Sequence, residues 1–572
     1  MKTSDYIVAF LIKQGIHDIF GYPGGMITHF MDSLDQYSAE ISAHANYHEQ
    51  ASAMAACGWA EITGLPGVAY ATSGPGATNL ITGIACAYFE SLPGIFITGQ
   101  VNTYEQKGAL GVRQKGFQET DIVSMAKPVT KAAYRVQTAA ELPEVLEGAY
   151  RMAMSGRKGP VLLDIPMDVS RGEIPAVPKK VEVRQECSGK RVQESTRQIM
   201  AELRRAKRPV ILAGHGISVS GCRDLFRGLV DAVGVPVVTS MIAVDLLPGK
   251  SPYSFGMIGA YGLRWANYLL NHSDCIVALG SRMDCRQTGV NKALFAPDAK
   301  ILRVDIDSGE LENRIHDKEA GYPLPLEALL PELLRQASET SWDFSEWLQC
   351  CNRVRHQLEA VGNKEPGNLL AEKLGQILPE NITVTTDVGQ NQVWIAQSMG
   401  IKERQRVLFS GGHGAMGYSL PAAIGAALAT KRPVVCVCGD GGFQMNLQEL
   451  QFVVRENLPV KIVLMNNRAL GMIHHFQEMY FAGNYMQTDA SKGFTVPDFT
   501  AIAKAYGLRS FHADSFDKLA DVFADMEPAF IECSLPQSTY VFPKLGLNKP
   551  IHEQEPALPK GLLQELDRIC GF

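Results

Sequence analysis

Two polar motifs in the last third of the chain each follow an apolar run of strand length. Asp440 lies in Gly-Asp-Gly-Gly directly after the run VVCVC, and Asn467 follows the run KIVLM, 27 residues further on. Parallel strands of an open α/β sheet present their carboxyl ends at one edge, where such sheets bind ligands. Carboxylate and amide oxygens suit Mg²⁺, and glycines let the backbone approach a phosphate closely. The spacing therefore predicts a magnesium and phosphate site, although two ordinary strand-to-helix turns would leave the same pattern.

An acidic residue near the beginning of the chain is a second candidate. Glu49 stands between a histidine and a glutamine, after a short extended segment and before the small-residue run ASAMAACGWA, which predicts a helix. A glutamate at a helix start is favourable for electrostatic reasons alone, because it faces the positive end of the helix dipole. Its position by itself leaves open whether Glu49 is a helix-stabilising charge or a reactive carboxylate.

Strand-length apolar runs alternate with helical patterns in three blocks, and these elements must position both candidates. The alternation predicts an α/β fold of three doubly wound parallel-sheet domains. We expect these domains over 1–177, 192–340 (Rossmann-like) and 366–545, followed by a C-terminal tail over 546–572. A Lys-rich linker (178–191) and a polar helical bridge (about 341–365) lie between the blocks. The clearest predicted strands are 67–72, 94–99, 160–166, 208–214, 236–240, 275–282, 300–307, 382–389, 432–442 and 461–467.

Composition narrows the class of protein. The 572 residues carry a formal net charge of −6 and no long basic block, so we expect no nucleic-acid partner. The apolar run Ile7–Ile12 is too short for a signal peptide or a membrane span, so we expect no membrane partner. The 12 cysteines are scattered, and Cys436 and Cys438 lie in a predicted buried strand. We expect reduced core thiols in a cytoplasmic protein.

The stretch GDGGFQMNLQEL…LPVKIVLMNNRALGM resembles the thiamine-diphosphate motif of the acetohydroxyacid synthase (acetolactate synthase) superfamily, and the likeness begins at GYPGG (21–25). It implies an enzyme that uses thiamine diphosphate and Mg²⁺. By this resemblance Asp440, Asn467 and the carbonyl of Ala469 hold the metal. The same resemblance assigns contacts with the diphosphate and the thiamine rings to Val388, Gly389, Gln390, Asn391, Gly414, Met416, Gly441, Gly442 and Met472. Asn391 stands where the synthases usually carry histidine.

The resemblance also gives Glu49 a role, because YHEQASAMA aligns with the HEQ motif of the synthases. It implies a buried carboxylate that shares a proton with the pyrimidine of thiamine. Pro75 and Asn79 lie in TSGPGATN, which resembles the pyrimidine-side loop, and Gln118 of Phe-Gln-Glu is expected to reach the reacting carbonyl. Because the family builds one cofactor site from two subunits, the resemblance implies a homodimer or homotetramer.

A central segment, GSRMDCRQTG (280–289), resembles the FAD-contacting segment of the synthases. Arginines neutralise phosphates, and an aspartate at a strand end accepts ribose hydroxyls. Cys285 replaces an aspartate of the family, and a Rossmann-like block without ligand stays an alternative. Any FAD is expected to be structural, because carboligation involves no net redox change; flavin-dependent oxidation is a lesser alternative. The residues on flavin positions are Arg157, Gly214, Gly216, Arg282, Arg286 and Asp305.

Four departures from the synthases are expected to cluster at the mouth of the active site and to shape the acceptor pocket. Met26, Met167 and Phe476 stand where the synthases have a small alanine, a lysine and a tryptophan, and the stretch 102–115 is longer than theirs. The implied reaction is decarboxylation of a 2-oxo acid, pyruvate, with transfer of the two-carbon unit to a carbonyl acceptor.

Two alternatives to that reaction remain. One is a branched-chain-sugar carboligase acting on a nucleotide-ketosugar, because GVRQKGFQETDIV and NKPIHEQEPALP resemble a subgroup associated with nucleotide-sugar and polysaccharide pathways. The other is a non-catalytic, cofactor-binding scaffold.

Overall fold

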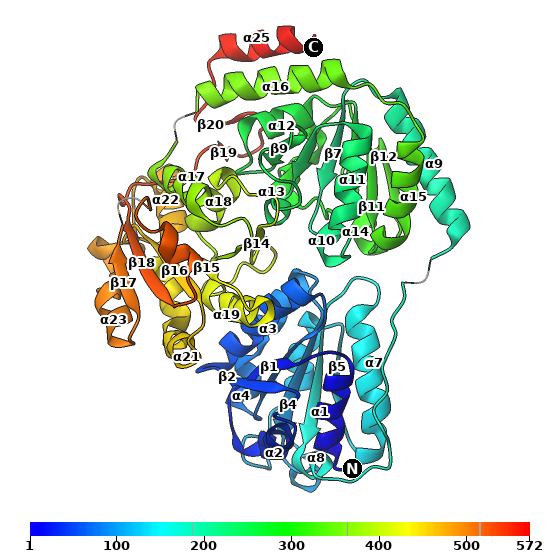
Figure 1. Cartoon of the computed structure of the whole chain (residues 1–572), viewed down its shortest axis with the longest axis vertical. Coiled ribbons are helices and arrows are strands. Elements are labelled where there is room, and N and C mark those ends of the chain that lie inside the picture. The colour runs from blue at the N-terminus through cyan, green and yellow to red at the C-terminus, as the bar shows by residue number, and fades with distance from the viewer. Residues whose placement is uncertain (186, 363, 514–515, 572) are drawn as a thin grey trace.

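The computed structural model describes residues 1–185, 187–362, 364–513 and 516–571. Across these residues the chain forms three parallel six-stranded sheets with helices on both faces. Figure 1 shows the first sheet in blue at the bottom, the central one in green at the top right and the third in yellow and orange at the left. The predicted α/β fold of three doubly wound domains is confirmed.

The first sheet has the strand order β2-β1-β3-β4-β6-β5. Its strands are β1 (Asp18–Gly21), β2 (Ser42–Ala45), β3 (Gly67–Ala71), β4 (Gly94–Gln100), β5 (Ala132–Arg135) and β6 (Pro160–Pro166). Around it lie α1 (Thr3–Lys13), α2 (Thr28–Gln36), α3 (Glu49–Thr63), α4 (Pro75–Asn79), α5 (Ile81–Phe89), α6 (Ile122–Ala126), α7 (Leu142–Met154) and α8 (Met167–Ser170).

The central sheet has the order β12-β11-β10-β7-β8-β9, which is the Rossmann order and changes direction between β7 and β10. Its strands are β7 (Pro209–Ala213), β8 (Val237–Thr239), β9 (Ser254–Met257), β10 (Cys275–Leu279), β11 (Lys300–Asp305) and β12 (Glu319–Pro323). Its helices are α9 (Gly189–Arg205), α10 (Gly216–Val219), α11 (Arg223–Val233), α12 (Arg264–Asn271), α13 (Cys285–Thr288), α14 (Ser308–Glu312) and α15 (Leu326–Ser338), and the predicted bridge forms α16 (Ser345–Ala360).

The third sheet, ordered β14-β13-β15-β16-β18-β17, repeats the strand order of the first. Both change direction between their first and third strands, where ligands bind in open α/β sheets. The strands are β13 (Thr383–Thr386), β14 (Arg406–Leu408), β15 (Val434–Gly439), β16 (Val460–Asn466), β17 (Arg509–His512) and β18 (Ala529–Ser534). The helices are α17 (Pro366–Ile377), α18 (Gln390–Ser398), α19 (Ser419–Thr430), α20 (Asp440–Phe443), the 3₁₀ helix η7 (Gln444–Glu449), α21 (Leu450–Arg455), α22 (Gly471–Tyr480), α23 (Phe499–Ala505) and α24 (Ala520–Ala524).

Helices α3 and α19 join the first and third sheets through small residues. A Cβ atom added to Gly58 would lie 2.2 Å from the carbonyl oxygen of Ala422, and one added to Gly425 would lie 1.9 Å from that of Ala55. The two backbones therefore touch at positions where only glycine fits. Most residues of both helices are buried, so this contact is a single apolar core shared by two domains.

A buried network of charges connects all three sheets beside this contact. Arg406 of β14 reaches Glu61 of α3 at 3.2 Å and Asp245 of the central domain at 2.9 Å. Arg223 reaches Asp245 at 3.0 Å, and His215 lies 3.4 Å from Glu61. Burial alone would raise the pKa of Asp245, but the two arginines hold it down at about 2. The network thus compensates charges that would be costly to bury singly.

The predicted C-terminal tail lies against the central domain. Its strand β20 (Gln554–Glu555) pairs with β19 (Lys544–Leu545), and Arg264 donates to the carbonyl oxygens of Gln554 and Pro556 at 3.2 and 2.6 Å. The last helix, α25 (Lys560–Cys570), runs beside α16 (Figure 1). Residue 572 lies outside the described part of the chain.

The expectation of reduced cysteines is wrong for one pair. Cys350 of α16 and Cys570 of α25 form a disulfide with a Cα–Cα distance of 5.8 Å. The two residues are 220 positions apart in sequence, so their proximity depends on packing of the tail that no local pattern reveals. Cys436 and Cys438 are free and fully buried in β15, as predicted.

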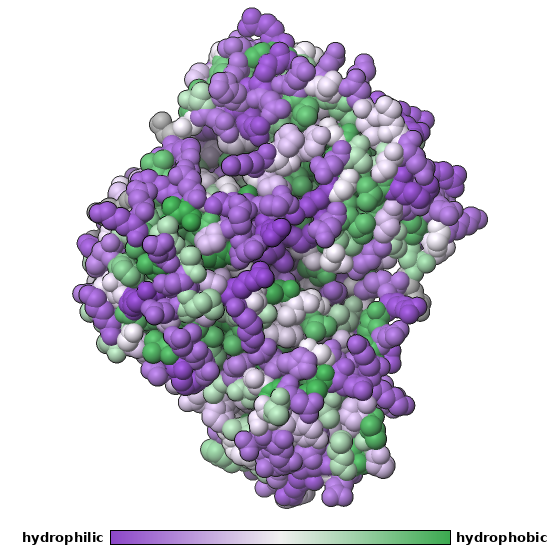
Figure 2. All heavy atoms as spheres, viewed as in Figure 1, coloured by the Kyte–Doolittle hydropathy of each residue, from purple (hydrophilic) through white to green (hydrophobic). Residues whose placement is uncertain are grey.

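Among the described helices, none is long and apolar enough to cross a membrane. Figure 2 shows hydrophobic side chains scattered among hydrophilic ones on one face of the molecule.

We predict that Arg406→Met lowers the free energy of unfolding by about 2 kcal/mol, because the change removes a cationic partner from two buried carboxylates. This loss is smaller than that expected for a fully buried ion pair, because Arg406 is partly exposed. Urea denaturation followed by fluorescence measures the effect. Arg404→Met is the matched control, because Arg404 is exposed and has no ion pair with any described residue.

The full loss of unfolding free energy in the Arg406→Met variant is expected at neutral pH. Glu61 and Asp245 have depressed pKa values, so their contribution is present above about pH 4 and is lost as the pH falls toward 2. Equal denaturation midpoints for the Arg406→Met and Arg404→Met variants at pH 7 would refute the role of the network.

Candidate functional site

The predicted metal ligands come together at the carboxyl edge of the third sheet. Asp440 follows β15 and is 3% exposed. Its Oδ2 accepts from the amide of Ala469 at 3.2 Å and its Oδ1 from the amide of Gly441 at 2.8 Å. Burial raises the pKa of Asp440 to about 6, and no lysine, arginine or histidine among the described residues pairs with it. A buried carboxylate without a cation fits a bound divalent metal.

Asn467 is locked to the loop that follows β13. Its side-chain amide donates to Oε1 of Gln390 at 3.1 Å, and Gln390 in turn donates to the carbonyl of Thr539 at 2.8 Å. A Cβ atom added to Gly471 would lie 1.9 Å from the same Oε1. The predicted metal loop and the predicted diphosphate loop therefore hold each other in place.

Glycines line the space between these loops. A Cβ atom added to Gly442 would lie 1.7 Å from Oδ2 of Asp387, and one added to Gly441 would lie 2.5 Å from Leu470 and 3.2 Å from Met416. The backbone is thus pressed against its neighbours at positions where only glycine fits.

Asn391 contributes an unsatisfied polar atom to this cradle. Its amide lies where Cβ atoms on Gly389 and Gly439 would come within 3.1 and 3.4 Å, and Gly389 has φ +152°. Its Oδ1 is buried and has no hydrogen-bond partner among the described residues. Such an atom costs about 1–3 kcal/mol unless a ligand, water or ion satisfies it. The cradle therefore fits a polar ligand. Asn391 can contact that ligand from the position where the synthases usually carry histidine.

Asp387 organises the loop of Gly414 and Met416, a role that sequence reasoning missed. It accepts from the amides of Gly417 at 3.1 Å and Tyr418 at 3.0 Å, and burial raises its pKa to about 7. Gly414 has φ +73° in the same loop. An aspartate at the end of an apolar strand, just before Val-Gly-Gln, was the available signal.

The residues predicted to activate the cofactor come together at the carboxyl edge of the first sheet. Glu49 begins α3, is 8% exposed, and accepts from the side chain of Asn79 at 3.0 Å. A Cβ atom added to Gly76 would lie 3.1 Å from Oε1 of Glu49, so the helix that begins at Pro75 lies directly on the carboxylate. Gln118 has φ +65° and approaches Gly74, whose added Cβ atom would lie 3.0 Å away.

Within one chain, no hydrogen bond of the described residues joins the Glu49 cluster to the Asp440 cluster. Among the hydrogen bonds of the described residues, the carboxylate of Glu49 has Asn79 as its partner, and none leads to the Asp440 loop. The nearby link between the domains is instead made by Glu449, which accepts from Asn46 and from the amide of Tyr47, both at 2.9 Å.

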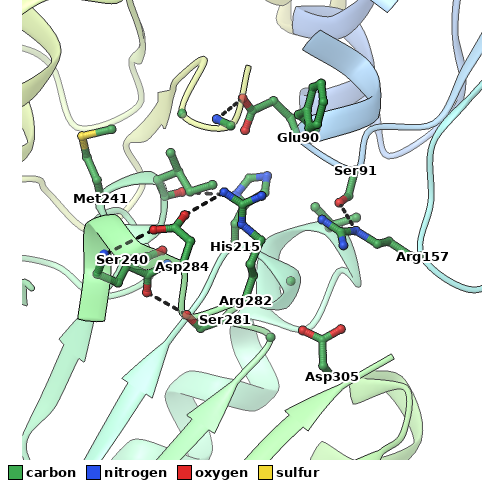
Figure 3. A pocket seen from close by; sticks show the side chains of 18 of the residues that line it. Glu90, Ser91, Arg157, His215, Ser240, Met241, Ser281, Arg282, Asp284 and Asp305 are labelled. Carbon is green, nitrogen blue, oxygen red and sulfur yellow. Dashed lines mark hydrogen bonds and ion pairs between the residues drawn. The ribbon is translucent and has the colours of Figure 1, made fainter. Parts of the chain in front are cut away.

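The predicted flavin residues border a groove between the domains (Figure 3). The groove encloses about 1330 Å³ of space, including its open mouth, at the point where the central sheet changes direction. Arg157, Gly216, Arg282, Arg286 and Asp305 line it. Gly214 does not line it, but an added Cβ atom there would lie 2.1 Å from the carbonyl of Gly280, so it sets the close approach of β7 and β10.

Two of the arginines already have protein partners. Arg157 donates to Ser91 at 2.9 Å and pairs with Asp307 at 3.2 Å and Glu310 at 2.7 Å, while Arg282 pairs with Asp284 at 2.7 Å. Arg286 is exposed and has no ion pair within the described ranges. Burial raises the pKa of Asp305 at the end of β11. The groove fits an elongated polar ligand, with Arg286 the freest cation for a phosphate.

The three predicted acceptor residues lie on different elements. Met26 lies in a 3₁₀ turn and donates its amide to Thr72 at 3.1 Å, Met167 begins α8, and Phe476 lies on α22 with 47% of its surface exposed. The aromatic rings that pack against Phe476 include those of Tyr480 and Phe481. The long stretch before Gln118 is ordered by Glu119, which accepts from the amides of Lys107 and Lys115 at 2.7 and 2.9 Å.

Comparison with known proteins matches three separate segments of the chain. Models of the thiamine pyrophosphate enzymes match it as an N-terminal TPP binding domain over residues 1–125, a central domain over 196–324 and a C-terminal TPP binding domain over 387–533.

Relatives match nearly the whole chain. The large subunit of acetolactate synthase isozyme 2 from Escherichia coli is 36% identical over 525 residues, covering 91% of this chain and 92% of the relative. The acetolactate synthase large subunit of Lactococcus lactis is 35% identical over 553 residues, covering 95% and 94%. A probable acetolactate synthase large subunit of Methanocaldococcus jannaschii is 35% identical over 559 residues, covering 93% and 91%. With this coverage and identity, the chain belongs to the thiamine-diphosphate-dependent acetohydroxyacid synthase (acetolactate synthase) superfamily.

Proposed function

We propose that this enzyme decarboxylates a 2-oxo acid, pyruvate, and transfers the two-carbon unit to a carbonyl acceptor. The observation that carries the proposal is the buried, uncompensated carboxylate of Asp440 in a cradle of glycines. The names of the relatives, which are acetolactate synthase large subunits, support the same reaction class.

The cradle residues would hold the cofactor. Thiamine diphosphate, when bound, supplies the nucleophilic carbon that adds to the keto group and accepts the electrons released with CO₂. Asp440, Asn467 and the carbonyl of Ala469 would hold Mg²⁺, which anchors the diphosphate. The diphosphate and the thiamine rings would contact Val388, Gly389, Gln390, Asn391, Gly414, Met416, Gly441, Gly442 and Met472.

Glu49 would hold a proton shared with the pyrimidine ring. Asn79 fixes the orientation of its carboxylate, and Pro75 begins the short helix that covers it. Gln118 would orient the acceptor carbonyl from the adjacent loop, with Met26, Met167 and Phe476 shaping the pocket.

The family resemblance supports a homodimer or homotetramer as the functional unit, in which Glu49 of one subunit would face the cradle of another. The lack of a hydrogen bond between the Glu49 and Asp440 clusters among the described residues of one chain is compatible with this arrangement. The central groove would hold FAD as a structural cofactor. Location in the cytoplasm and the absence of nucleic-acid and membrane partners stay predictions from the sequence.

A nucleotide-ketosugar is the second candidate acceptor. An exposed aromatic rim on α22, with Phe476 47% and Tyr480 40% exposed, favours an acceptor larger than a 2-oxo acid. A catalytically silent scaffold is less favoured, because both the Glu49 and Asp440 clusters are intact.

The products distinguish these possibilities. With thiamine diphosphate, Mg²⁺ and pyruvate alone, an acetolactate-forming enzyme gives acetolactate. A sugar carboligase gives slow acetaldehyde release and a new carbon–carbon product only when a nucleotide 4-ketosugar is added, which mass spectrometry detects. No CO₂ release from several 2-oxo acids would leave only the scaffold.

Glu49→Gln should retain thiamine diphosphate and lose CO₂ release by about 10²- to 10⁴-fold, because an amide cannot share the proton. Cofactor binding is measured by calorimetry and CO₂ release by a coupled assay. Glu40→Gln, an exposed position in the same domain, serves as the control. Normal turnover of the Glu49→Gln variant would disprove the assigned role.

Asp305→Asn should weaken retention of FAD by about tenfold, because a charged acceptor for ribose hydroxyls is lost. Gel filtration followed by flavin absorbance measures the retained cofactor, with Asp317→Asn at an exposed position as the control. Wild-type protein that takes up no FAD would leave the groove without its proposed ligand.

A further inference from the structure

A buried lysine without an anionic partner lies near the predicted acceptor pocket. Lys544 of β19 is 9% exposed, and its Nζ lies 3.3 Å from Sδ of Met479. The same ammonium lies over the rings of Phe476 and Tyr480, 5.5 and 5.6 Å from their centroids. Within the described residues no carboxylate comes within 4.0 Å of it. Aromatic faces and a thioether stabilise a buried ammonium less than an anion does.

The electrostatic surroundings point the same way. Burial lowers the pKa of Lys544, and no neighbouring carboxylate opposes that effect among the described residues. Burial, Lys544 and His474 together lower the pKa of His475 to about 4. Of the cationic groups here, His474 has a carboxylate nearby, Asp489 at 3.4 Å, whereas Lys544 has none among the described residues.

The position of the lysine relative to the cradle follows from helix α22. Its first residue, Gly471, touches Gln390 and Asn467 of the cradle. Met472, Phe476 and Tyr480 are spaced four apart, so they lie on one face of the helix. With a rise of 1.5 Å per residue, Phe476 lies about 7 Å and Tyr480 about 13 Å along the axis from Gly471. Lys544 thus lies about two helical turns beyond the cradle, within the length of an extended acceptor.

A purely structural role does not account for the charge. The backbone of the strand is fixed independently, because Leu545 donates its amide to the carbonyl of Ala260 at 2.7 Å and pairs with Gln554. A methionine of similar length would fill the same space beside Met479 and the two rings. The exposed edges of Phe476 and Tyr480 leave a way in from solvent.

We propose that Lys544 binds the anionic group, a carboxylate or a phosphate, of the carbonyl acceptor. This inference rests on the proposed carboligase function. The aromatic pair forms the rim, the ammonium holds the acid group, and the acceptor carbonyl lies toward the cradle. The enzyme thereby prefers acidic over neutral acceptors.

The test is Lys544→Met, which keeps the volume and removes the charge. We expect the KM for acidic acceptors to rise about tenfold or more, the change produced by losing about 1.4 kcal/mol of binding. Two acidic acceptors are tested, each with pyruvate as donor. One is 2-oxobutanoate, which offers a carboxylate, and the other is a nucleotide 4-ketosugar, which offers phosphates. The acceptor whose KM rises in the variant identifies the anionic group that Lys544 binds. The KM for acetaldehyde, a neutral acceptor, should stay within about twofold of wild type, because acetaldehyde has no anionic group for the lysine to bind.

Two controls keep the outcome decisive. Lys549→Met removes a lysine of the same segment that already pairs with Glu555 at 2.7 Å, so it should leave every KM unchanged. Lys544→Arg should restore part of the affinity. Calorimetry of each acceptor with the cofactor-loaded enzyme measures binding without turnover, so Lys544 is tested even if wild-type enzyme releases no CO₂ and the proposed function fails. Equal affinity of wild type and the Lys544→Met variant for both acidic acceptors would overturn the inference, as would an equal loss for acetaldehyde.

Discussion

The contact between α3 and α19 is the constraint on which the arrangement of the molecule depends. Two glycines let the helix backbones touch, so the first and third sheets share one core. Helix α3 begins at Glu49 and carries Glu61 near its other end, where Arg406 and His215 hold it. Its 15 residues span about 22 Å. The orientation of the Glu49 carboxylate, for which we propose the activating role, is therefore set by the same helix that the buried charges fix at its far end.

Much of the fold could be predicted from the sequence, because strands of parallel sheets are buried on both faces and therefore form continuous apolar runs. The strand 160–166 was predicted with its observed bounds, and Pro160–Pro166 is buried throughout. The sheet edge at which Asp440 and Asn467 meet was also predictable. Both residues follow apolar runs of strand length, and the family resemblance covers both positions. Short edge strands such as β2 and β14 were not predicted, because their few residues show no clear apolar pattern. The family itself, inferred from the motifs around Glu49 and Asp440, is confirmed by the relatives.

Features that depend on packing between residues far apart in the chain could not be predicted from the sequence. Asp387 accepts hydrogen bonds from backbone amides of a loop about thirty residues later in the chain. Arg157 of the first domain forms ion pairs with Asp307 and Glu310 of the central domain. Lys544 is ordinary in the sequence; its lack of an anion appears only when α22 and the tail are seen together. Charge compensation is a property of the folded arrangement, so a sequence pattern shows which charges exist but not which ones are matched.

The bond between Cys350 and Cys570 encloses the whole third sheet, because β13 to β18 lie between the two cysteines. In the oxidised protein this part of the chain is a closed covalent ring anchored on the central domain. A single proteolytic cut in an exposed loop of that ring would leave both fragments in one molecule, and they would separate only after both reduction and unfolding. The third domain, with its glycine cradle, is in this way tethered at both ends, so a single cut there does not by itself release it.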